Sequence, residues 1–177
     1  MASLSNTLHY SAPDFSPSQL SNCTLNLKIA AWELIAVIID DQNSVKAVLQ
    51  FPFSDQQPWQ EQVMNLFSTN NILSFKNWKA INVITCSKHF SLIPDQIFNP
   101  DLLDQYQRLL FQPTPGERIA YTKHTNGYVN VFGLDAALEE WVNKFYGRNV
   151  NFFHQTSGLI ETVTNTTFAE QMNLSVH

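Results

Sequence analysis

Apolar and polar residues alternate along residues 24–29 and again along residues 45–51, and a continuous apolar run occupies residues 34–39 between them. Alternation with a period of two predicts a strand with one buried face, whereas a continuous run predicts a strand buried on both faces. Short turns at residues 30–33 and 40–43 separate the three segments. Because such short connections join antiparallel neighbours, we expect a three-stranded antiparallel meander.

The rest of the chain changes between helical and strand patterns. Helical spacing marks residues 58–69, about 100–112, 135–146 and 157–172, and strand patterns mark residues 80–85, 90–93, 119–121, 128–132 and 150–153. Asn126-Gly127 predicts a tight hairpin turn, Asp135 can cap the third helix and Gly147 can end it.

The element order is therefore β-β-β-α-β, an inserted β-α-β-β section, and then α-β-α. A meander followed by αβ units predicts an α/β fold in which parallel strands extend a mixed sheet flanked by helices. We expect the strands at residues 80–85 and 150–153 to run parallel to the first strand. This is the layout of the ribonuclease-H-like and actin-like ATPase folds, with an inserted β-hairpin section.

Composition supports a single ordinary domain and restricts its partners. The chain has 177 residues, of which 44% are hydrophobic, which is ample for a core. Its net charge is −5 and it contains no basic run, which argues against nucleic-acid binding. Residues 1–23 are polar and contain two prolines, so we expect most of them to form a loose lead-in.

The cysteine pattern and the apolar runs favour a soluble cytoplasmic protein. Cys23 and Cys86 form no CxxC motif, which predicts free thiols in a reducing compartment. The first 18 residues lack the pattern of a secretion signal. The longest apolar run, residues 34–39, is far too short to span a membrane.

Five short stretches, in this order and spacing, carry a family resemblance. They are Thr24-Leu-Asn-Leu-Lys-Ile29, Ile81-Asn-Val-Ile84, Phe90-Ser-Leu-Ile-Pro94 with Phe98, Tyr128-Val-Asn-Val-Phe132, and Phe153-His154 leading into Ser157-Gly-Leu-Ile-Glu161. The chain from Thr24 onward resembles an uncharacterised bacterial family, domain of unknown function 3822, whose fold is of the actin-like ATPase kind. Its members look longer and have a second half built on the same plan.

The resemblance implies that this chain is the N-terminal half of such a protein. Residues 24–172 would form the half-domain, and residues 173–177 would begin a truncated second half. Leu174 and Val176 alternate with polar neighbours there, as at the start of a strand. A fragment of this kind would expose the surface that faced its other half, so we expect self-association.

The resemblance also locates the nucleotide site that such folds carry. Actin-like ATPases have an aspartate at the end of the first strand, near the metal, and a glycine that follows it. These positions fall at Lys28 and Ala30, with Trp32 where small residues are usual. A carboxylate is needed to position hydrated Mg²⁺, and a residue without Cβ lets the backbone approach phosphates. Lys28 is the one weak candidate for a phosphate contact, and a solvent-facing structural lysine is the alternative.

Other candidate residues have simpler structural interpretations. Asp40-Asp41 suits a turn better than a metal pair, because adjacent residues after a strand point apart. His89, His124 and His154 lack metal-ligand spacing, and His154 fits a packed position at a strand end.

The remaining candidates are a serine, a cysteine and the tryptophans. Ser157 fits a helix cap and Cys86 a buried, inert thiol. Trp59 and Trp141 are expected in the core, whereas Trp32 and Trp78 lie in connections and are candidates for exposed contact residues. We therefore assign no catalytic, cofactor or metal residue, and the first strand has no carboxylate for a two-metal nuclease.

Three functions remain open from the sequence. The first is a non-catalytic interaction or scaffold module that keeps an actin-like ATPase fold, has lost the ATP-binding residues and binds an unidentified protein partner. The second is a nucleotide-binding or ATP-hydrolysing protein whose site is completed by the second half. The third is a small-molecule binder that uses the cleft between two halves.

Overall fold

The computed structural model describes residues 7–111, 114–148 and 150–161. The chain divides into two compact units, which are considered separately below. Unit 1 comprises Met1–Cys86 and Glu140–Phe152, and unit 2 comprises Ser87–Glu139 and Phe153–His177. The chain passes between them after β5 and within α3 and β9.

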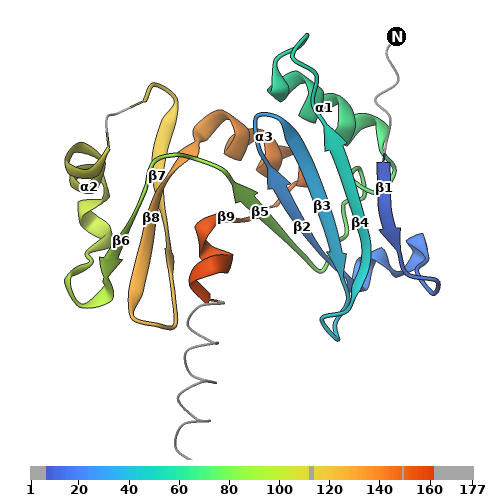
Figure 1. Ribbon diagram of the computed structural model, residues 1–177, viewed down its shortest axis with the longest axis horizontal. Helices are drawn as coiled ribbons and strands as arrows, with labels where there is room; N and C mark the ends of the chain where they lie inside the picture. Colours follow the sequence, from blue (N-terminus) through green and yellow to red (C-terminus); the bar gives the residue numbers. More distant parts are fainter. Residues whose placement is uncertain (1–6, 112–113, 149, 162–177) are drawn as a thin grey trace, which may run out of the picture. The chain divides into compact units, whose positions relative to one another are not determined.

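A six-stranded sheet with the order β1-β4-β3-β2-β5-β9 forms the framework of unit 1 (Figure 1). β2, β3 and β4 make the predicted antiparallel meander, and β5 pairs with β2 in parallel. The strands are β1 Thr7–Ser11, β2 Thr24–Ile29, β3 Glu33–Ile39, β4 Val45–Pro52, β5 Ala80–Thr85 and β9 Asn151–His154. The mixed α/β sheet predicted from the sequence is thus confirmed.

The alternating pattern places one face of this sheet in the core. Leu25 and Leu27 on β2 and Leu34 and Ala36 on β3 are completely buried. β3 alternates between buried and half-buried residues, so the prediction that it is buried on both faces was wrong. Helix α1, Trp59–Thr69, packs here, and its buried Phe67 makes an edge-to-face contact with Trp141 of α3.

The N-terminal segment of unit 1 is more ordered than the sequence suggested. β1 pairs with the edge of β4, and the 3₁₀ helix η1, Pro17–Asn22, follows. Ser16 and Gln19 form a reciprocal capping box at the start of η1. The prediction of a loose lead-in is therefore wrong for the described residues before Cys23.

The inserted section forms the three-stranded antiparallel sheet of unit 2, with the order β6-β8-β7. The strands are β6 Phe90–Pro94, β7 Glu117–Lys123 and β8 Tyr128–Asp135, and the short helices are η2 Asp95–Ile97, η3 Pro100–Leu102 and α2 Leu103–Leu110. Gly127 has φ +81° in the turn that joins β7 to β8, as the Asn-Gly pair predicted. One sheet face carries a small core, to which Val129 and Val131 contribute and on which Tyr106 of α2 packs.

The two later helices follow the predicted signals in part. The Asp135 carboxylate accepts the Leu138 N–H at 3.0 Å, and α3, Ala136–Tyr146, is followed by Gly147 with φ +67°. Residues 156–161 are helical, whereas the rest of the predicted last helix and residues 173–177 lie outside the described residues. No helix in the described ranges is both long and apolar enough to cross a membrane.

Candidate functional site

The turn between β2 and β3 contains the residues that the resemblance placed at the nucleotide site. The Lys28 Nζ donates to Glu33 Oε1 at 2.9 Å, and the other oxygen of Glu33 accepts from Gln50 Nε2 at 2.7 Å. Lys28 faces the same side of the hairpin as Glu33, because their positions are diagonal across the β2–β3 pair. Glu33 was not singled out in the sequence, although the opposite charges on one hairpin face were a usable signal.

Each charge of this pair supports the other. The hydrogen bond to Glu33 raises the pKa of the Lys28 ammonium, although partial burial acts against it. The hydrogen bond from Lys28 lowers the pKa of the Glu33 carboxyl, and that from Gln50 lowers it further. Lys28 is therefore charged but paired, on an interior strand of the sheet, rather than a free lysine facing solvent.

The backbone of the same turn is closed by its own hydrogen bonds. Ala30 is buried, and its N–H donates to the carbonyl oxygen of Glu33 at 2.9 Å. Trp32, at the tip, is 60% exposed, as predicted, and its ring centroid lies 5.9 Å from Lys28 Nζ. The turn thus presents the Trp32 side chain to solvent, while Lys28 and the Ala30 N–H both form hydrogen bonds with Glu33 inside the turn.

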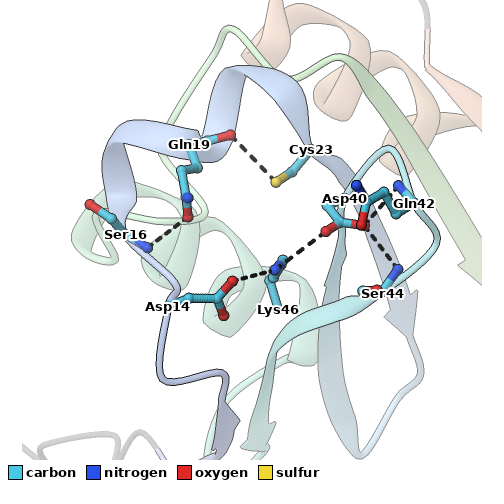
Figure 2. Close-up of polar contacts among 8 residues, drawn as sticks. All are labelled: Asp14, Ser16, Gln19, Cys23, Asp40, Gln42, Ser44 and Lys46. Carbon is cyan, nitrogen blue, oxygen red and sulfur yellow. Dashed lines mark hydrogen bonds and ion pairs between the residues drawn. The ribbon is translucent and has the colours of Figure 1, made fainter.

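Unit 1 also contains a polar pocket of about 330 Å³. Figure 2 shows the Lys46 ammonium of this pocket between the carboxylates of Asp14 and Asp40. Lys46 Nζ is 2.8 Å from Asp14 Oδ2 and 3.3 Å from Asp40 Oδ2. The lining residues are Asp14, Gln19, Asn22, Cys23, Asp40, Asp41, Gln42 and Lys46.

The aspartates of this pocket have structural partners. Asp40 Oδ1 accepts the N–H groups of Gln42 and Ser44, both at 2.9 Å, which confirms that Asp40-Asp41 forms a turn (Figure 2). Asp41 pairs with Lys79. The sequence missed this pocket because it forms only when the segment before Cys23 folds against the β3–β4 turn.

The three predicted histidines all lie in unit 2, and the structure connects two of them. Ser87 is the link: its hydroxyl accepts the N–H of His89 at 3.0 Å, and its carbonyl oxygen lies 2.7 Å from His154 Nε2. Glu117 pairs with His89 Nδ1 at 2.7 Å and accepts from the Ser87 hydroxyl at 3.1 Å. His154 is buried, which confirms its predicted packed position.

Several other predictions need correction. Trp78 is buried against Phe75, with ring centroids 5.5 Å apart, so it is not an exposed contact residue. The last helix begins at Thr156, which places Ser157 inside its first turn rather than at its cap. Cys86 is half-buried, and burial raises the pKa of its thiol, which is the opposite of nucleophile activation.

Two tryptophans were predicted to lie in the core, and no metal site was predicted. Trp59 and Trp141 are both half-buried, so the prediction that they lie in the core is confirmed only in part. Within residues 7–111, 114–148 and 150–161, no cluster of three or more histidine, cysteine or acidic side chains could hold a metal ion.

Comparison with known proteins identifies the family and the fold. A family model described as "Protein of unknown function (DUF3822)" matches residues 12–177. A Bacteroides thetaiotaomicron protein "with actin-like ATPase fold and unknown function" is 20% identical, with a TM-score of 0.79 over 88% of this chain and 60% of that one. This chain therefore spans 60% of the length of that protein, and the likeness establishes an actin-like fold.

A second solved structure is more distant. It is the cytoplasmic domain of EpsL, an inner membrane component of the type II secretion system of Vibrio cholerae, at 16% identity. The TM-score is 0.40 over 73% of this chain and 53% of that one, which is too low to support any inference. Among curated proteins, none matches this chain.

Proposed function

We propose that this chain, which belongs to the DUF3822 family of proteins of unknown function, is a non-catalytic interaction module built on an actin-like fold. One observation carries the proposal: Glu33 holds both residues that the resemblance placed at the metal and glycine positions, Lys28 and Ala30. Its carboxylate holds Lys28 Nζ at 2.9 Å, and its carbonyl oxygen holds the Ala30 N–H at 2.9 Å.

A phosphate at this turn would have to share the Lys28 ammonium with Glu33. Glu33, whose other oxygen is fixed by Gln50, would then remain as a half-buried negative charge beside the phosphate. Like charges at that distance repel, and burial reduces the screening that water provides. The closed turn favours a structural role for Lys28.

The tip of the same turn is suited to contact with another protein. Trp32 is 60% exposed, and tryptophan is enriched at the energetic centres of protein interfaces. We therefore propose a protein partner that contacts the Trp32 tip, with a second copy of this chain as one candidate. The free thiols of Cys23 and Cys86 support the proposal of a cytoplasmic location.

Calorimetric titration of the chain with MgATP at millimolar concentration tests the non-catalytic part of the proposal. We expect no saturable heat from the wild type, and the same result for Lys28→Ala and for the matched control Lys79→Ala, which removes an exposed lysine paired with Asp41. A micromolar dissociation constant that is weakened by Lys28→Ala but not by Lys79→Ala would contradict the proposal. It would favour instead a nucleotide-binding protein in which this turn forms part of the site.

A further inference from the structure

His154 anchors the start of a short helical segment in unit 2. Its Nε2 lies 2.7 Å from the carbonyl oxygen of Ser87, and a carbonyl can only accept, so Nε2 carries the hydrogen. Nδ1 then holds the free electron pair and accepts the Thr156 N–H at 3.3 Å, with the Thr156 hydroxyl at 2.8 Å. The neutral ring thus caps the helical residues 156–161. We call residues 154–161 the strap.

Protonation of His154 is incompatible with this cap. A hydrogen on Nδ1 would face the Thr156 N–H, and although the Thr156 hydroxyl can rotate to accept, the N–H cannot. The added charge would also lie at the N-terminus of a helical segment, where the peptide dipoles are positive. His154 is 1% exposed, and it contacts the Phe90 and Phe132 rings, Thr156 and the Ser87 carbonyl. The titratable pair His89–Glu117 is joined to it through Ser87.

The other end of the strap is held by a pair that mild acid preserves. His124 Nδ1 lies 2.8 Å from Glu161 Oε1, and the Thr125 hydroxyl donates to Glu161 Oε2 at 3.0 Å. An ionised carboxylate only accepts, so Nδ1 of His124 carries the hydrogen of this bond. The hydrogen bond from His124 lowers the pKa of Glu161, so this end stays ionised in mild acid.

The sheet surface under the strap is buried but incompletely satisfied. Asn130 of β8 is fully buried and donates to the Thr156 hydroxyl at 2.9 Å, while its Oδ1 has no partner among the described residues. Nε2 of His124 is likewise buried without a described partner. An unsatisfied buried polar atom costs free energy that exposure to water would recover, so part of the cost of opening the strap would be returned at this face.

From this geometry we infer that the strap is a proton-operated latch: neutral His154 keeps its first turn on the β6-β8-β7 sheet, and protonation releases that turn while Glu161 holds the far end. Release exposes Asn130 and the Phe132 ring, which are fully buried in the closed form. Burial lowers the pKa of His154 from its ordinary value of 6.5, in the direction that the latch requires. The latch does not depend on the proposed interaction function or on ATP binding.

Hydrogen exchange of the whole chain at pH 7.5 and pH 5.5, corrected for intrinsic rates, tests the latch. An open state with an ordinary histidine pKa gains up to about tenfold in population at pH 5.5 over a closed state that cannot be protonated. We expect protection of residues 156–161 to fall by up to that factor, with β2 and β3 unchanged. Equal protection of the strap at both pH values would overturn the inference.

Two variants separate the latch from a general effect of acid. In His154→Asn, the amide oxygen can accept the Thr156 N–H but cannot titrate, so strap protection should no longer depend on pH. The matched control His89→Gln removes another histidine of unit 2 and should leave the dependence intact. If His154→Asn does not fold, nuclear magnetic resonance can follow the titration of the His154 imidazole in the wild type. An apparent pKa below 6.5 supports the latch, and one at or above 6.5 refutes it.

Discussion

The two units differ in what they bury. In the described part of unit 1, the buried set is almost wholly apolar, and its charged pairs join lysines to carboxylates, as in Lys28–Glu33 and Lys46–Asp14. Unit 2 also has a small apolar core, but it buries His124, Asn130, His154 and Ser157 as well. Unit 1 is therefore held by apolar area and by ion pairs of lysines with carboxylates, whereas unit 2 relies in addition on a buried polar network that includes His154, whose pKa is lowered by burial.

This difference indicates where each unit can change state. Apolar burial contributes roughly 25 cal/mol per Å² whatever the pH, and exposed ion pairs add little. A buried polar network is worth much when every partner is present and costs free energy when one is lost. We expect unit 1 to respond mainly to packing changes, and unit 2 to respond also to single polar atoms and to protons.

The largest effect should come from the core of unit 1. Leu27→Ala removes a completely buried side chain from β2, an interior strand, and should cost about 3 kcal/mol of unfolding free energy through lost burial and a residual cavity. Urea unfolding measures this cost. Leu109→Ala, at a position 81% exposed on α2, is the control and should change stability by less than about 0.5 kcal/mol. A Leu27→Ala cost below 1 kcal/mol would show that this face is not the main source of stability in unit 1.

A smaller effect should follow from crowding the polar network of unit 2. A Cβ added at Gly133 would lie 2.0 Å from Glu117 Oε1, so Gly133→Ala must displace the carboxylate that holds Ser87 and His89. We expect a loss of about 1–3 kcal/mol, because two hydrogen bonds of partly buried groups are broken.

Gly158→Ala is the matched glycine control for that prediction. A Cβ at Gly158 would meet no other atom within 4 Å, and the residue is helical, so this change should be neutral or stabilise by up to about 1 kcal/mol. Thermal unfolding of both variants checks the contrast. Equal melting temperatures would show that the position of Glu117 does not matter to unit 2.

A third effect concerns the pH at which each unit loses stability: unit 1, through Glu33, should be affected only at a lower pH than unit 2. Glu33→Gln leaves Lys28 without its counter-charge and should cost about 1 kcal/mol at pH 7. The pKa of Glu33 is lowered in the folded chain, so the stabilisation it provides is present above about pH 4.5 and is lost as the pH falls further. For His154, whose pKa is also lowered, the loss begins below about pH 6.5.

Urea unfolding of the wild type and of Glu33→Gln between pH 7 and pH 3.5 measures the acid limit of unit 1. The difference between them should stay constant to about pH 4.5 and then shrink, because the wild-type carboxyl becomes neutral as well. The control Gln60→Ala, at an exposed and uncharged position of α1, should show no such dependence. A difference that already shrinks at pH 6 would place the acid-sensitive group of unit 1 elsewhere.

The sequence predicted the sheet of unit 1 well because its period of two directly encodes burial. Leu25 and Leu27 alternate with polar neighbours, and this pattern alone fixes both the strand and its buried face. The Asn126-Gly127 turn and the Asp135 cap were also readable, since each depends on the backbone chemistry of one or two residues. Periodicity and local chemistry thus gave most of the fold.

What the sequence did not reveal depends on partners that are distant along the chain. β1 is a strand because it pairs with β4, and the polar pocket exists because Asp14 and Lys46 meet across 32 positions. The network around Ser87 likewise joins His154 to Glu117. No local sequence pattern predicts such contacts. The spacing of the three histidines therefore indicated no site, and residues 1–23 were expected to form a loose lead-in.

The smallest effect should be found at the Trp32 tip. A substitution there tests whether the Trp32 side chain stabilises unit 1. Trp32 is 60% exposed and lies outside the apolar core, so Trp32→Ser should alter the unfolding free energy by less than about 0.5 kcal/mol. Trp78→Phe is the control within the same unit, and it should cost about 1–2 kcal/mol because Trp78 is buried against Phe75. Acrylamide quenching should fall in Trp32→Ser, since the most accessible indole is removed.

A loss above 1 kcal/mol in Trp32→Ser would mean that the tip stabilises the fold, and it would weaken the case that a partner contacts it. An unchanged melting temperature, together with lost quenching, would leave Trp32 as a large apolar side chain that the fold itself does not need.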